Sequence, residues 1–397
     1  MMRLADWRYS DTDSSRDLRF DFLRGAVMLV MIVVHIEVFS LFDFIAWERA
    51  GVVSGAEGFV ILSGVVVGMV YGRKIAQIPF GESALKVLAR AAQLYRVNLA
   101  IIGSILLLRY LPGFDTTQVA TFTDRVSGRA YPLFPFAGMR TEDFVTQVVY
   151  LRVGPHQTQV LGLYVYLMIL AVPALYLMAR GRTALLLVAS WATYALQALL
   201  PTRPTTAQFE FAFPLLTWQL LFMHGLAVGF HRDALAAFSK RPAAKWLIGA
   251  AIAITLALAF FAQNTPNVLI PSYARLHLIP AATYRRIYRA FCQKSTLGLL
   301  RILDDAALLT VAYTTLTVFW KPLKRAFGWY FIPIGQSSLY AFIMHLYIAL
   351  LASNVVQFGF DANSSPPLLR NTLVHAAALA TAWLLVRYRV LYRWIPR

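Results

Sequence analysis

The chain has 397 residues, of which 59% are hydrophobic and only 14% are charged, and its mean hydropathy is +0.59. This composition is far more apolar than that of a soluble globular domain, so it excludes that class. The formal net charge of +18 suggests a nucleic-acid partner, but the basic residues fall at the ends of apolar segments and in loops. Membrane topology and anionic lipid explain basic residues there, so we exclude nucleic acid as a partner and expect the lipid bilayer instead.

By segment length, the sequence predicts an all-α, polytopic membrane protein of about ten transmembrane helices. An even number of spans puts both termini on the same side of the membrane. Because the basic residues at the span ends gather on that side, we predict that both termini are cytoplasmic. We predict a single membrane domain over 1–397, with a short cytoplasmic segment 1–20 and outer loops at about 111–157 and 263–302. The predicted spans lie near residues 22–44, 56–72, 84–110, 158–179, 183–200, 211–230, 244–262, 303–320, 331–353 and 369–389.

The first span opens with alternating charges and then continues as an apolar run to about Phe44, with His35 as its one internal ionisable group. The step of eleven residues from Arg24 to His35 puts both side chains on one helix face, about 16 Å apart. Neither is tolerated facing lipid, so both are expected to face a lumen between helices. The alternative is that Arg24 anchors the helix end at the membrane surface and His35 only bonds a neighbouring helix.

The second span carries glycines every fourth residue, at Gly64, Gly68 and Gly72. This spacing is typical of helices that pack closely in lipid. Glu57 precedes Gly64 by seven residues, near the same face, so close packing brings a carboxyl group towards a neighbouring helix. Glu57 is therefore predicted to act in catalysis or to form a structural ion pair.

The beginning of the third span is cationic, with Lys86, Arg90 and Arg96 in its cytoplasmic half. Snorkelling to the headgroups accounts for the first two, but less easily for Arg96. A phosphate-binding opening is the other interpretation, because arginine and lysine are the usual partners of phosphate groups. Its predicted members are Arg24, Arg73, Lys74, Arg90 and Arg96.

The segments RDLRFDFLRG, from Arg16 to Gly25, and GAEGFVILSG, from Gly55 to Gly64, resemble the membrane-bound acyltransferase-3 superfamily, in particular its OpgC branch. OpgC proteins are proposed succinyltransferases of osmoregulated periplasmic glucans. Later stretches extend the resemblance along most of the chain, including GQSSLYAFIMHLYI from Gly335 to Ile348. The resemblance implies transfer of an acyl group from cytoplasmic acyl-CoA to a hydroxyl of an extracytoplasmic glycan, by a multi-pass protein of the inner (plasma) membrane.

The resemblance also implies residue roles. Arg24 and His35 match the essential arginine and histidine of the family, Ser63 belongs to its second-span motif, and His345 matches a histidine in a late span. A sugar hydroxyl attacks a thioester only when a base removes its proton, and histidine has a suitable proton affinity near neutral pH. We expect His35 to be that base and His156, near the outer mouth, to be a second candidate base.

Several points stay open at this level. A succinyl donor needs a further cation near the acyl terminus, for which Arg152 and Arg301 are candidates, so succinyl-CoA and acetyl-CoA are not separated. The single cysteine, Cys292, excludes a cysteine-rich metal site, and no metal is expected. A transporter or flippase without acyl transfer is the competing function, although no pair of halves with matching broken helices stands out. The oligomeric state, a homodimer included, is also open.

Overall fold

The computed structural model describes residues 7–9, 16–123, 130–134, 140–267, 270–356 and 367–397. Parts of the predicted cytoplasmic segment (1–6 and 10–15) and of the two predicted outer loops (124–129, 135–139 and 268–269) lie outside the described residues. The described strands make one antiparallel pair, β1 (Thr121–Thr123) with β2 (Ala130–Pro132).

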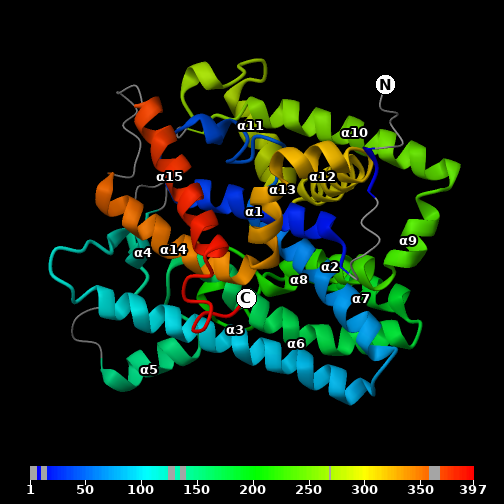
Figure 1. The fold of residues 1–397 in the computed structure, drawn as a ribbon, viewed down its shortest axis with the longest axis horizontal. Coiled ribbons are helices and arrows are strands. Elements are labelled where there is room, and N and C mark those ends of the chain that lie inside the picture. Colours follow the sequence, from blue (N-terminus) through cyan, green and yellow to red (C-terminus); the bar gives the residue numbers. More distant parts are fainter. Residues whose placement is uncertain (1–6, 10–15, 124–129, 135–139, 268–269, 357–366) are drawn as a thin grey trace.

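Helices make up most of the rest of the described chain (Figure 1). The short helical turns are η2 (Leu41–Phe44), η3 (His156–Thr158), η4 (Gln208–Phe211) and η5 (Ser272–Ala274), which are 3-10 helices, and the π-helical η6 (Tyr288–Cys292). The α-helices are α1 (Leu18–His35), α2 (Gly55–Ile75), α3 (Phe80–Leu108), α4 (Thr117–Ala120), α5 (Thr141–Val149), α6 (Gln159–Ala179), α7 (Thr183–Leu199), α8 (Leu215–Phe230), α9 (Arg232–Phe238), α10 (Pro242–Gln263), α11 (Ala281–Ile287), α12 (Leu299–Val318), α13 (Trp320–Gln336), α14 (Ser338–Val355) and α15 (Leu368–Arg387).

The all-α membrane fold predicted from the sequence is confirmed, because several of these helices are long and apolar enough to cross a membrane. Among the described residues six helices meet that criterion, and a seventh does if α12 and α13, which meet at a bend of 107°, count as one broken span. Each of the ten predicted spans overlaps a helix, but α7 and α8 are short. The count of ten and the cytoplasmic position of the termini stay predictions.

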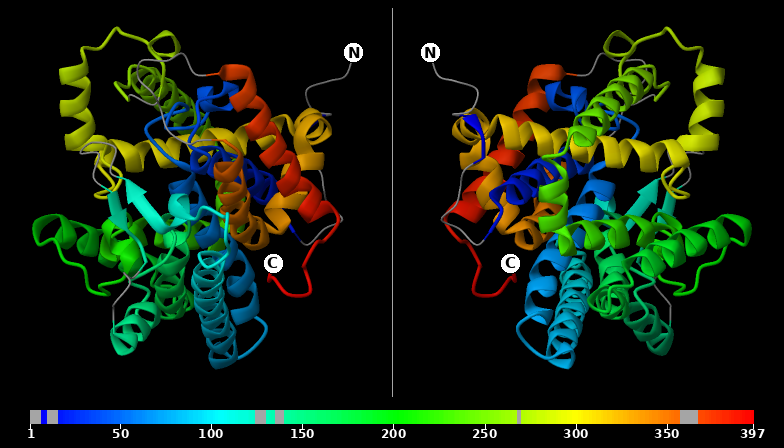
Figure 2. Two further views of the ribbon diagram at one scale, coloured as in Figure 1. Left: turned by 90° about the vertical axis from the view of Figure 1, so that its left-hand side faces the viewer. Right: turned by 90° about the vertical axis from the view of Figure 1, so that its right-hand side faces the viewer.

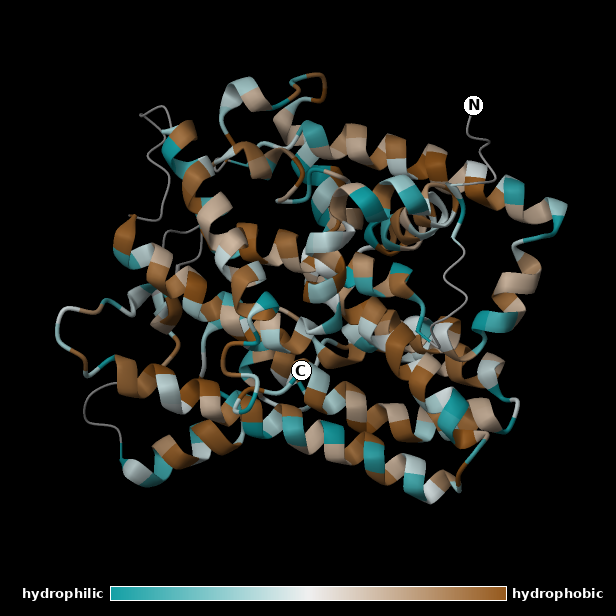
Figure 3. Cartoon of the chain, viewed as in Figure 1, coloured by the Kyte–Doolittle hydropathy of each residue, from teal (hydrophilic) through white to brown (hydrophobic). Residues whose placement is uncertain are grey.

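Figure 3 shows how apolar residues are distributed over the helices. Brown residues run along α10, whereas α3 has teal residues towards its first half and brown ones in its second. The helix α3 lies alongside α6, which it contacts (Figure 1). The polar first half of α3 is therefore the part that carries the predicted cations.

The helix α1 lies at the centre of the molecule (Figure 1) and contacts α2, α12, α13, α14 and α15. It begins after Asp17, whose carboxylate accepts a hydrogen bond from the Arg19 backbone N–H at 3.1 Å, as an N-cap residue does. The prediction that the helix continues to Phe44 is wrong: α1 ends at His35, and Ile36 is extended, with φ −99° and ψ 91°. His35 is thus the last residue of the helix.

The predicted close packing of the second span is confirmed, and its partner is α8. A Cβ atom added at Gly64 or Gly68 would overlap the backbone of Phe222 or Leu226. The contact is reciprocal, because a Cβ at Gly225 or Gly229 would overlap the backbone of α2. Both helices therefore use glycines four residues apart to bring their backbones together, as membrane helices commonly do.

The segment between α10 and α12 forms an arm at one side of the molecule in both views of Figure 2. The basic, aromatic stretch 280–291 is helical there, over the two short elements α11 and η6. Tyr284 stacks on Phe261 of α10, with ring centroids 4.5 Å apart. This ring contact fixes α11 against the last turn of α10.

Candidate active site

Arg24, in the first half of α1, is held by a contact with α14. Its Nη2 donates to the Ser338 hydroxyl at the start of α14, whereas its Nε is buried and has no hydrogen-bond partner among the described residues. One turn earlier in α1, the Asp21 carboxylate accepts two hydrogen bonds from the Arg16 guanidinium, each of 2.6 Å. The Asp21 charge still acts on Arg24, but its direct bonds are with Arg16, and the guanidinium of Arg24 retains a donor for an anionic ligand.

The backbones of α1 and α13 approach each other closely next to Arg24. A Cβ at Gly25 would overlap the Phe331 carbonyl, and one at Gly335 would overlap the Asp21 backbone. Only glycine allows these two backbones to come so near. The adjacent Arg24 side chain is consequently directed away from α13, towards α14 and α6.

Two more of the predicted cations gather near Arg24. Arg90 of α3 interacts electrostatically with Arg24 and with Tyr71, and the Lys74 ammonium lies 5.0 Å from the Tyr71 ring centroid. On the other side of Arg24 the Tyr164 hydroxyl is directed towards Ser63 and Arg24. Arg24, Arg90, Lys74 and Ser63 thus form one connected region at one end of the helix bundle.

Arg73 and Arg96 are less closely associated with this region. Both side chains are exposed, and the Arg96 Nε bonds only the Ala92 carbonyl of its own helix, at 3.4 Å. Six residues separate Arg90 from Arg96, which turns the two side chains about 120° apart around α3. The structure therefore does not bring Arg96 together with Arg24.

His35 pairs with His345 of α14 across a hydrogen bond of 3.1 Å, between Nδ1 of His35 and Nε2 of His345. The other nitrogen of His345, Nδ1, contacts the Phe342 carbonyl, which accepts only, so this Nδ1 carries the proton. His345 Nε2 is then an acceptor, and His35 Nδ1 must be the donor. The hydrogen of neutral His35 is consequently on Nδ1, and its Nε2 carries a lone pair to which no hydrogen-bond donor is seen among the described residues.

A third histidine, which the sequence analysis did not single out, fixes the end of α1. Nε2 of His375, in α15, lies 3.2 Å from the Val33 carbonyl and 3.1 Å from the Ile36 carbonyl, and its Nδ1 lies 2.7 Å from the Ser40 hydroxyl. Both carbonyls also accept a backbone N–H, from Ile36 and from Val38, so His375 adds a further bond at the helix end, where carbonyls lose their regular helical partners. It stabilises the backbone that positions His35. An ionisable residue inside the apolar segment 369–389 was the signal that could have found it.

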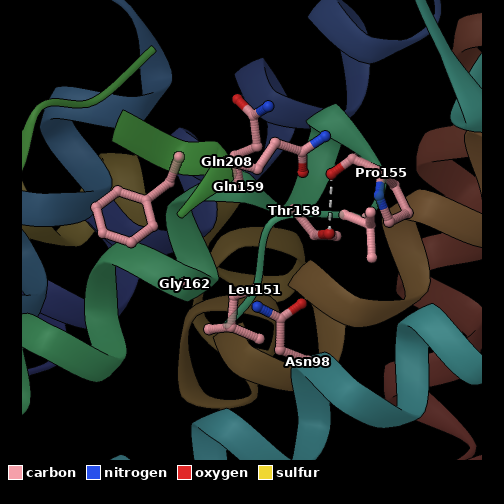
Figure 4. A pocket seen from close by; sticks show the side chains of 10 residues that line it. Asn98, Leu151, Pro155, Thr158, Gln159, Gly162 and Gln208 are labelled. Carbon is pink, nitrogen blue, oxygen red and sulfur yellow. Dashed lines mark hydrogen bonds between the residues drawn. The ribbon is translucent and has the colours of Figure 1, made fainter. Parts of the chain in front are cut away.

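His156, the second candidate base, lies near His35. It belongs to η3, just before α6, and its ring centroid lies 6.3 Å from that of His35 and 5.6 Å from that of Phe122. The adjacent residues line a polar recess of about 10 Å³, to which Asn98, Gln159 and Gln208 contribute amide groups (Figure 4). That volume holds about one water molecule, so the recess cannot take a sugar ring without opening.

Glu57 lies in a buried ion pair with Arg301 of α12, which was one of the two roles open to it. Its carboxylate also accepts from the Ser54 backbone N–H at 3.1 Å and from the Ser54 hydroxyl, and so caps α2. Arg301 further contacts Glu48 at 2.5 Å and Tyr288 at 3.1 Å, and donates from Nε to the Cys292 carbonyl at 2.7 Å. Every Arg301 nitrogen is therefore engaged, and the side chain is not available for a succinyl carboxylate.

The other candidate for that carboxylate, Arg152, is exposed and bonds the Thr206 hydroxyl at 2.9 Å. A cation that the sequence analysis did not select is nearer to the histidines. Lys294, half-buried between η6 and α12, interacts electrostatically with both His35 and Glu57. No residue pattern pointed to it, because it comes from a loop more than 250 residues away in sequence.

The geometry therefore joins, on one central helix, a cationic region around Arg24 and a histidine whose Nε2 is unprotonated. A model of the family described as OpgC protein matches residues 16–394, nearly the whole chain. The chain belongs to the OpgC family. Family membership and the apolar helices fit a membrane-bound transferase. A comparison with curated proteins finds no match. Among the described residues no three His, Cys, Asp or Glu side chains are grouped as a metal site would require.

Proposed function

We propose that this OpgC-family protein is an O-acyltransferase that moves a succinyl group from cytoplasmic succinyl-CoA to a hydroxyl of an extracytoplasmic glycan. The observation that carries the proposal is the His35–His345 pair, in which His35 uses Nδ1 and keeps the Nε2 lone pair available, on the same face of α1 as the half-buried Arg24. A general base needs a lone pair at a defined atom, and the chain supplies one.

The donor would enter at the end of the bundle where Arg24, Arg90 and Lys74 gather. Its phosphates would bind these cations, Arg24 through the Nε that has no partner among the described residues. The pantetheine arm would then follow α1 inwards. Arg24 and His35 are eleven residues apart, about 16 Å along the helix, which is a distance of the same order as the length of that arm.

One base, His35, is enough for the transfer, because it takes one proton and returns it. The glycan hydroxyl transfers its proton to Nε2 of His35 while its oxygen forms a bond to the thioester carbonyl carbon. The carbon–sulfur bond then breaks, and the imidazolium of His35 returns the proton to the leaving thiolate of CoA. The hydrogen bond from Nδ1 to His345 stabilises the positive charge that His35 carries in between.

Lys294 supports a donor whose acyl group ends in a free carboxylate. The Lys294 ammonium group interacts electrostatically with the His35 side chain. It belongs to the segment between α10 and α12, and the far end of a succinyl group would lie beside it. An acetyl group has no charge for Lys294 to bind. We therefore assign succinyl rather than acetyl as the preferred group, with Lys294 in place of Arg301 as its carboxylate partner.

The deciding experiment measures release of the CoA thiol by the purified protein in nanodiscs, with succinyl-CoA and with or without an acceptor glucan. We expect release that depends on glucan, and its loss in His35→Ala. His224→Ala is the matched control, because His224 bonds Trp191 and the Leu220 carbonyl away from α1. A carrier would release no thiol, and full activity in His35→Ala would remove His35 as the base.

A further inference from the structure

A groove of about 210 Å³ lies between α1, α2, α12 and the loop that connects α1 to α2. On α1 it is lined by Leu23, Ala26, Val27 and Val30. The mean direction of these side chains is about 120° around the helix from that of Arg24 and His35, at 100° per residue. The groove is therefore separate from the proposed acyl-transfer site.

The walls of the groove are apolar and partly open to the surroundings. Val27, Val30 and, on α12, Leu308 and Leu309 are only half-buried although they line it. The lining on α1 runs from Leu23 to Val30, seven steps along the helix, which is about 10 Å. Its volume exceeds the roughly 150 Å³ in which an engineered apolar cavity binds benzene, so it can take a hydrocarbon chain.

One end of the groove carries a buried cation, Arg49, with only 3% of its surface exposed. Its Nη2 donates to the Ala274 carbonyl, but Nε and Nη1 have no hydrogen-bond partner among the described residues. Burial, and secondly the charge of nearby Arg275, lower the pKa of Arg49. Arg275 itself has a buried Nε for which the described part of the chain supplies no acceptor.

Acidic groups also lie near this end, but they do not neutralise the two arginines. The Glu48 carboxylate is bound by Arg301 and by the Tyr288 hydroxyl at 2.8 Å. Asp305 lines the groove, and its buried Oδ2 is without a partner among the described residues. Two adjacent guanidinium groups with unused donors favour an anion with several acceptor oxygens, and the Asp305 oxygen can accept from a hydroxyl or ammonium group beside it.

We propose that this groove binds one phospholipid molecule, with its phosphate at Arg49 and Arg275 and one acyl chain along the apolar walls of α1, α2 and α12. A phosphate diester satisfies the unused guanidinium donors, and a hydrocarbon chain fills the space that leads away from them. The inference is independent of the acyl transfer proposed above.

The test measures phospholipid bound to the full chain, purified in detergent and delipidated, by native mass spectrometry with added short-chain phosphatidylglycerol. We expect one molecule per chain. Arg49→Gln combined with Arg275→Gln should weaken binding at least about tenfold, and so should Ala312→Phe, which fills the groove from α12. Arg286→Gln on exposed α11 and Leu256→Phe on the exposed side of α10 are the matched controls and should bind as the unaltered protein does.

Inorganic phosphate at the same concentration should not displace the lipid, because the chain supplies much of the affinity. Displacement by phosphate alone would show a simple anion site and overturn the proposal. Equal lipid binding by the double arginine variant, or by Ala312→Phe, would overturn it as well. If Ala312→Phe fails to fold, lipid binding by the double arginine variant decides the test. A lack of any bound lipid in the unaltered protein refutes the proposal outright.

Discussion

The hydrogen bond from His35 to His345 gives a sharp test of the catalytic geometry, because two amide substitutions replace different atoms of the His345 ring. In His345→Gln the amide lies near the position of Nε2, so its oxygen can accept the bond from His35 Nδ1. In His345→Asn the amide lies near Nδ1 and can donate to the Phe342 carbonyl, but it leaves His35 without an acceptor. The two variants thus separate the two contacts of one residue.

The expected size of the effect follows from that contact. A hydrogen bond between uncharged groups contributes about 0.5–1.5 kcal/mol, and a buried donor left unpaired costs about 1–3 kcal/mol. His345 is fully buried, so no water replaces it easily. Since about 1.4 kcal/mol is tenfold in rate, His345→Asn should lower kcat roughly 10- to 1,000-fold, and His345→Gln should stay within about tenfold of the unaltered protein.

The assay is glucan-dependent release of CoA thiol, followed from pH 5 to 9, with the thermal unfolding temperature in detergent as the control for folding. KM for succinyl-CoA should stay nearly constant, because neither variant alters the cationic region around Arg24. Equal kcat values for the Asn and Gln variants, with both folded, would refute the tautomer argument. A change in KM alone for His345→Asn, with kcat unaltered, would refute the tautomer argument as well.

Three further outcomes are expected. Arg301→Gln should destabilise the protein by about 3–5 kcal/mol, because Glu57 is left buried without its partner, and urea unfolding in detergent will measure it. Burial raises the pKa of Cys292 to about 11, so maleimide should not label this thiol at pH 7.5 until the protein is denatured; labelling of the native chain would show that the outer arm is open. Lys294→Met should lower kcat/KM for succinyl-CoA about tenfold or more but leave acetyl-CoA turnover unchanged, and parallel losses with both donors would argue against a carboxylate contact.

The sequence by itself determined the membrane class and where apolar helices occur, but not where each helix ends: α1 stops at His35, and the predicted span 331–353 is divided between α13 and α14. The membrane class and the apolar helices both follow from local properties, namely the length of apolar runs and the spacing of residues on a helix. The same local geometry put Arg24 and His35 on one face of α1. The glycines at Gly64 and Gly68 predicted close packing, but they did not identify α8 as the partner.

Tertiary structure alone decided what each polar residue does. Glu57 meets Arg301 from 244 residues away and becomes a structural ion pair, and His35 meets His345 from 310 residues away and acquires a defined tautomer. The end of α1 at His35 depends on His375, from a helix that follows by more than 300 residues. Such contacts leave no periodic trace in the chain, because a buried charge or imidazole can be satisfied by any suitable partner that the packing brings to it.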